Sequence, residues 1–156
     1  MSFNPMKLTS CSGFGSGFAI GFPRCTRQLI LSVGQYMITP LEKAVLDLML
    51  NRDCEPYITL REQLVHATVM TREFSGVGFF THFALPKSAP VRRDVADMVI
   101  QDVAAEISGL AHGASFILFV RDGVLSCLEG VASVGEWPSD IGGFKAYKLQ
   151  TRPTIR

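Results

Sequence analysis

The chain has 156 residues and a mass of 17.1 kDa, with 47% hydrophobic and 19% charged residues. This is the composition of one globular domain and excludes a mainly disordered chain. A formal net charge of +1 gives no support for nucleic acid or an acidic membrane surface as a partner. No stretch approaches the roughly 20 apolar residues of a membrane-spanning helix. We therefore predict neither a nucleic-acid nor a membrane partner.

The first 36 residues differ in composition from the remainder. They carry three basic residues and no acidic residue, and they are rich in Gly and Phe, whereas residues 37–156 have a net charge of −2. The longest apolar run, residues 18–22, ends at Pro23 and is too short for a secretory signal. We predict that residues 1–36 form a poorly ordered extension. Two interpretations stay open: an arm that docks on a partner, or a mis-assigned start with Met37 as the natural first residue.

The four cysteines, Cys11, Cys25, Cys54 and Cys127, include no C-x-x-C pair. This spacing favours neither a zinc knuckle nor a redox pair, and Cys127 lies in an apolar strand pattern where a buried thiol is expected. We therefore expect free thiols, a cytoplasmic location and no metal or cofactor.

The elements begin with a helix after Thr39. Thr39 is a suitable N-cap, Pro40 suits the first helical position, and Glu42 has the spacing that completes a capping box. A second, shorter helix is expected over about 57–66, starting either at a cap on Thr59 or earlier, after Pro56. Together these helices predict a hairpin.

From Ala67 onward the pattern becomes that of strands. Strand-forming residues precede a turn at Ser75-Gly76, and the best hairpin signal is Asp122-Gly123. Residues 95–107 are ambiguous, because valines recur every four residues within a β-like run, and we favour a strand near 98–107. The remaining strands are expected over 77–83, 115–120, 124–129 and, at an edge protected by two lysines, 144–149. The predicted fold is α+β: one domain over 37–156, with an N-terminal helical hairpin packed on a mostly antiparallel sheet of five or six strands.

Five segments carry a resemblance. LREQL at 60–64, REFSGVGFFT at 72–81 and HGASFILFVRDG at 112–123, with LE at 128–129 and WP at 137–138, resemble a set of small uncharacterised bacterial proteins. The resemblance covers roughly residues 38–140. It implies a domain unit beginning near Met37 and implies no catalytic residue.

Candidate catalytic residues are few. His82 and His112, with Asp102 or Glu106, are the groups that a small hydrolase or metal-dependent enzyme would use. No pair has the spacing that fixes two metal ligands on one element, and no nucleophile motif follows a strand.

Apolar residues offer a different interpretation. Phe79, Phe80 and Phe83 lie in one expected strand, and Trp137 lies in a later loop. An exposed member of this set would indicate a protein partner. We therefore predict a non-enzymatic domain that acts by binding another protein or by self-association, with the enzyme as the alternative.

Overall fold

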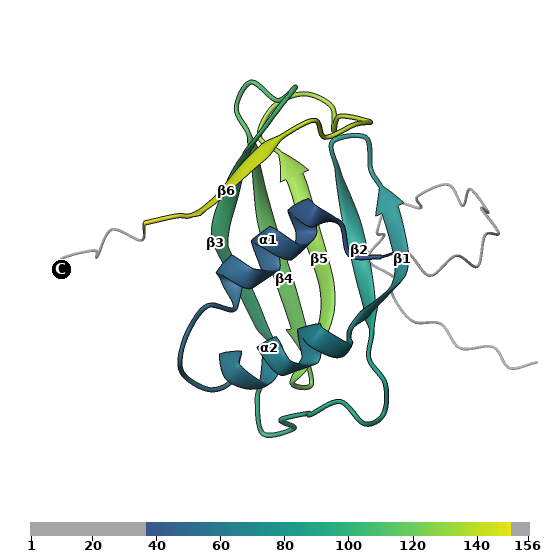
Figure 1. The fold of residues 1–156 in the computed structure, drawn as a ribbon, viewed down its shortest axis with the longest axis vertical. Helices are drawn as coiled ribbons and strands as arrows, with labels where there is room; N and C mark the ends of the chain where they lie inside the picture. The colour runs from purple at the N-terminus through teal and green to yellow at the C-terminus, as the bar shows by residue number, and fades with distance from the viewer. Residues whose placement is uncertain (1–36, 151–156) are drawn as a thin grey trace, which may run out of the picture. The chain divides into compact units, whose positions relative to one another are not determined.

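The computed structural model describes residues 37–150, which form two helices and one six-stranded antiparallel sheet (Figure 1). The predicted extension over residues 1–36 lies outside the described residues, as do residues 151–156. The helices are α1 (Pro40–Met49) and α2 (Tyr57–His66). The strands are β1 (Thr68–Phe74), β2 (Gly78–Ala84), β3 (Met98–Ile107), β4 (Ala114–Arg121), β5 (Val124–Ala132) and β6 (Phe144–Lys148). The predicted α+β class is confirmed.

Helix α1 begins as its sequence predicts. The Thr39 hydroxyl accepts from the Glu42 amide at 3.2 Å, and the Glu42 carboxylate accepts from the Thr39 amide at 2.7 Å. This reciprocal capping box satisfies amides that have no partner inside the helix. Helix α2 takes the earlier of its two predicted starts, directly after Pro56 and without a side-chain cap. Within residues 37–150, neither helix is long and apolar enough to cross a membrane.

The strands are ordered β1-β2-β5-β4-β3-β6, and every pair is antiparallel. The predicted hairpin turn joins β4 to β5, with φ of +50° at Asp122 and +72° at Gly123. Such positive values are why an Asp-Gly pair is favoured there. The β5 strand lies between β2 and β4, so β1 and β6 become the two edges of the sheet.

Both helices lie across one side of the sheet (Figure 1). We call this side the covered face and the opposite side the open face. Side chains alternate between them, as burial along β2 indicates: Phe79, Thr81 and Phe83 are buried on the covered face, and the intervening Phe80 and His82 are half-buried on the open face. The largest fully buried side chains of the covered face come from α1, α2 and the central strands, and include Leu46, Met49, Leu60, Phe116, Leu118 and Leu128.

The ambiguous segment 95–107 contains a strand, β3, as the sequence analysis favoured. Its register against β4 shifts between Ile100 and Val103, which marks a β-bulge. Beyond the bulge, Val103, Ala105 and Ile107 are buried, whereas Val99 before it is half exposed. The bulge therefore places Val99 and Val103 on opposite faces although they are four residues apart.

Candidate functional site

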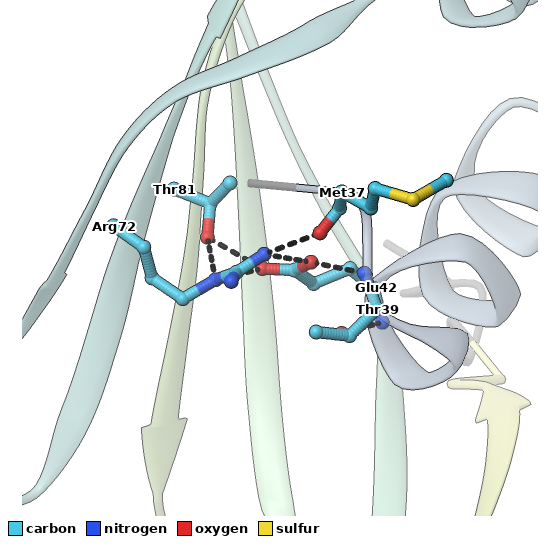
Figure 2. Close-up of polar contacts among 5 residues, drawn as sticks. All are labelled: Met37, Thr39, Glu42, Arg72 and Thr81. Carbon is cyan, nitrogen blue, oxygen red and sulfur yellow. Dashed lines mark hydrogen bonds and ion pairs between the residues drawn. The ribbon is translucent and has the colours of Figure 1, made fainter. Parts of the chain in front are cut away.

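A buried ion pair joins helix α1 to the first two strands, as Figure 2 shows. Glu42 is 1% exposed, and its carboxylate accepts two hydrogen bonds from the Arg72 guanidinium, at 2.9 and 2.7 Å. The Thr81 hydroxyl donates a third, at 2.5 Å, and the capping amide of Thr39 a fourth. Arg72 also donates to the Met37 carbonyl at 3.0 Å. The carboxylate therefore has four hydrogen bonds and a fixed orientation.

This network is a structural device that positions the start of α1. Burying a carboxylate is costly unless it is paired and hydrogen-bonded, and here both conditions are met. The sequence analysis identified Glu42 only as part of a cap and did not identify Arg72 or Thr81. One signal was available: Thr81 is a polar residue at an inward position of a strand whose other inward side chains are phenylalanines.

Beside this network lies a cavity of about 310 Å³, which we call the aromatic pocket. It is bounded by the first turn of α1, the end of the β1–β2 hairpin and the loop before β6. Its apolar lining consists of Pro40, Leu41, Phe74, Phe79, Trp137, Pro138, Ile141 and Phe144. Thr39, Glu42, Ser139 and Asp140 supply its polar groups.

The aromatic rings of the pocket pack edge to face. The centroids of Phe79 and Trp137 are 5.0 Å apart with the planes at 74°, and Trp137 is also edge-on to Phe116 at 6.5 Å. This geometry is preferred because the ring edge is electropositive and the face electronegative. The Trp137 amide donates to the Gly76 carbonyl at 2.7 Å and so fastens the loop to the β1–β2 turn. Phe74, at the mouth, is 66% exposed.

The four predicted binding residues separate into three environments. Phe79 and Phe83 are core residues, 4% and 7% exposed, and Phe79 also forms a wall of the aromatic pocket. Phe80 is half-buried on the open face, opposite Glu129. Trp137 lines the aromatic pocket. The structure thus brings Phe79 and Trp137 together and directs Phe80 to a different surface.

The predicted catalytic residues do not gather at one place. His82 lies on β2 and Asp102 on β3, with β5 and β4 between them. Three strand spacings of about 4.8 Å separate β2 from β3 by roughly 14 Å, beyond hydrogen-bond or metal-ligand reach. His112 and Glu106 do line one hollow, of about 660 Å³, together with Lys145 and Tyr147.

Asp102 lies at the bulge of β3, beside the end of α1. Its Oδ2 accepts from Arg52 at 2.8 Å, and this hydrogen bond is the main cause of the raised pKa of Arg52. The Lys148 ammonium is 4.0 Å away. The other oxygen of Asp102, Oδ1, is buried and accepts no hydrogen bond from residues 37–150. The Asp102 carboxylate is therefore engaged in an ion pair with Arg52.

Two cysteines belong to the described part of the chain, and both are free: Cys54 is exposed and Cys127 is buried. Burial raises the pKa of the Cys127 thiol from an ordinary 9.0 to about 11, with further contributions from the charges of Glu129 and Glu73. A thiol with so high a pKa is a poor nucleophile at neutral pH. Between residues 37 and 150, no three His, Cys, Asp or Glu side chains lie together as metal ligands.

Comparison of the chain with protein-family models, with curated proteins and with solved structures finds no match. The candidate site therefore stands on its geometry alone.

Proposed function

We propose that this protein is a non-enzymatic binding domain whose aromatic pocket receives an apolar side chain from another protein. The observation that carries the proposal is the aromatic pocket itself, where Trp137 packs edge-on against Phe79 beside an exposed Phe74. Aromatic residues at the rim of a preformed apolar cavity are the usual anchors of protein–protein recognition. A volume of about 310 Å³ is at the small end for ligand sites and suits one side chain better than a cofactor.

Charge at the pocket indicates the partner's chemistry. Asp140 in the lining and Glu136 next to Trp137 are both exposed acids. The third acid, Glu42, is already neutralised by Arg72. No Lys or Arg belongs to the lining formed by the described residues. The preferred partner segment therefore carries a large apolar residue with basic residues beside it.

Trp137 supplies the test, because it is the only tryptophan in the chain. The probes are two pentapeptides with a central phenylalanine, one flanked by lysines and the other by glutamates. The lysine peptide is expected to change Trp137 emission saturably and to bind about two- to fivefold more tightly, as for exposed ion pairs worth up to ~1 kcal/mol. A Phe74→Ser variant should weaken binding, whereas Val99→Ser, a similarly exposed apolar position on the open face, should not. Unchanged emission with both peptides would overturn the proposal.

For the enzymatic alternative, the remaining candidate active site is the hollow that His112 and Glu106 both line. A histidine and a carboxylate at one surface hollow are the minimum for general acid–base chemistry. To test this second candidate, hydrolysis of a simple ester or phosphoester is measured. The candidate requires that the protein hydrolyses the substrate, that His112→Ala abolishes this activity and that His82→Ala leaves it intact. Activity that is absent, or equal in both variants, would remove it.

We also propose that the protein belongs to the set of small bacterial proteins that it resembles. The same proposal includes a cytoplasmic location and no cofactor. They rest on the quoted sequence segments and on the spacing of the cysteines.

A further inference from the structure

The open face of the sheet carries apolar side chains on four neighbouring strands. One row across four strands pairs His82 with Cys127, Cys127 with Phe119, and Phe119 with Val99. The next row pairs Phe80 with Glu129 and Glu129 with Ile117. No helix of residues 37–150 packs on this side, and Val99 is 51% exposed. Neighbouring apolar side chains on an uncovered sheet face are typical of an interaction surface.

We infer that a second copy of this chain occupies the open face, sheet against sheet, in a two-fold symmetric dimer. The inference goes beyond the proposed function and does not depend on the aromatic pocket. Two properties of the face support it: its size and its distribution of charge.

The face has the area of a stable interface. Six strands at about 4.8 Å spacing span roughly 24 Å. Strands β1 to β5 have seven to ten residues and extend roughly 23–33 Å at about 3.3 Å per residue, whereas β6 has five residues. The resulting area, at most roughly 550–800 Å², approaches the roughly 800 Å² that each partner contributes to a standard interface. A partner that covers it must be equally broad. A second copy meets this condition, since two sheets pack face to face at about 10 Å.

The charges of the open face are distributed unequally. Glu73 and Glu129 lie on the half formed by β1, β2 and β5. On the half formed by β4, β3 and β6, Arg121 pairs with Asp97 at 2.7 Å and Lys145 lies opposite Glu106 in register, so the charges of that half balance. A two-fold axis along the strands, between β5 and β4, places each acidic half over the partner's balanced half and so keeps the acidic residues of the two copies apart. An acidic partner would be repelled by the acidic half.

The test is the mass of the full chain in solution, measured by light scattering and by sedimentation over a range of protein concentrations. The expected mass is twice the 17.1 kDa of one chain. Ile117→Lys, at the centre of the open face, should give monomers, because it replaces an apolar contact of the interface with a charge that must lose its hydration. Val65→Lys is the matched control, since Val65 is 80% exposed on α2, and it should stay dimeric.

A second variant keeps the result decisive if Ile117→Lys does not fold. Val99→Lys changes a position that is already half exposed, so it should fold and still dissociate the dimer. A chain that is monomeric at every concentration would overturn the inference. So would a dimer that withstands both open-face substitutions.

Discussion

The two faces of the sheet differ in how deeply they bury charged side chains. On the covered face, even a carboxylate is fully enclosed, and Glu42 is 1% exposed with four hydrogen bonds. On the open face, acids and apolar side chains alternate at half burial, as in the row that pairs Phe80, Glu129 and Ile117. The same strands supply both faces. The difference teaches that the covered face sets stability and that the open face is available for recognition.

The largest expected effect comes from removing the buried carboxylate. Glu42→Ala leaves the Arg72 guanidinium, whose side chain is 13% exposed, without its partner and also removes the helix cap. A loss of about 3–5 kcal/mol in the free energy of unfolding is expected, measured by urea denaturation. Lys43→Ala breaks the exposed Lys43–Asp47 pair one residue away and should cost under about 0.5 kcal/mol. Similar losses in the two variants would contradict the contrast between buried and exposed pairs.

Neighbouring residues of β3 compare the faces directly. Ile100 is 4% exposed on the covered face, and Val99 is 51% exposed on the open face. Ile100→Ala should cost about 2–5 kcal/mol because it leaves a cavity in the core, whereas Val99→Ala should cost under about 1 kcal/mol. Thermal and urea unfolding of both variants measure the difference. A larger loss for Val99→Ala would show that the assignment of faces is reversed.

A third variant adds one methyl group to the covered face. A Cβ at position 130 would lie 2.5 Å from the Phe79 ring and 3.0 Å from the Phe116 ring. Gly130→Ala should therefore cost about 1–3 kcal/mol by overpacking and displace Phe79, which also lines the aromatic pocket. Trp137 emission should change in the folded variant. Full stability with unchanged emission would contradict this close packing.

The smallest effect concerns Cys127, a residue of the open face that is nevertheless buried. The pKa of the Cys127 thiol is raised to about 11 in the folded state. The stabilisation that comes from keeping this thiol neutral is therefore complete below about pH 9. The contribution is lost between pH 9 and 11, because only the unfolded chain gains a thiolate there. By linkage, stability should fall by about 0.8 kcal/mol between pH 8 and pH 9.5. The unfolding free energy of Cys127→Ala, compared at the two pH values, should lack this term.

Local signals account for most of what the sequence predicted about the fold. The Thr39–Glu42 cap and the Asp122-Gly123 turn depend on residues close in the chain, and both have the expected geometry. Residues 95–107 were harder because the bulge interrupts the two-residue period of a strand. Valines four residues apart would share one side of a helix. Across the bulge, however, Val99 and Val103 lie on opposite faces of the sheet.

The candidate site was less predictable because it is assembled from distant segments. The aromatic pocket joins residues near position 40, residues 74 and 79 and a loop near 137, and no local spacing relates them. The separation of His82 from Asp102 follows from strand order, since β5 pairs with β2 and inserts two strands between them. Sequence composition contains no information on that order.

The ion pair of Arg72 also couples an edge strand to a helix. Arg72 lies on β1, an edge strand that would ordinarily fray first, yet its guanidinium holds the carboxylate that caps α1. Separation of β1 from β2 would break the contact of Arg72 with both Glu42 and Thr81. We therefore expect the edge strand and the helix to open as one cooperative unit, so that the amide hydrogens of β1 exchange at the same rate as those of α1's first turn.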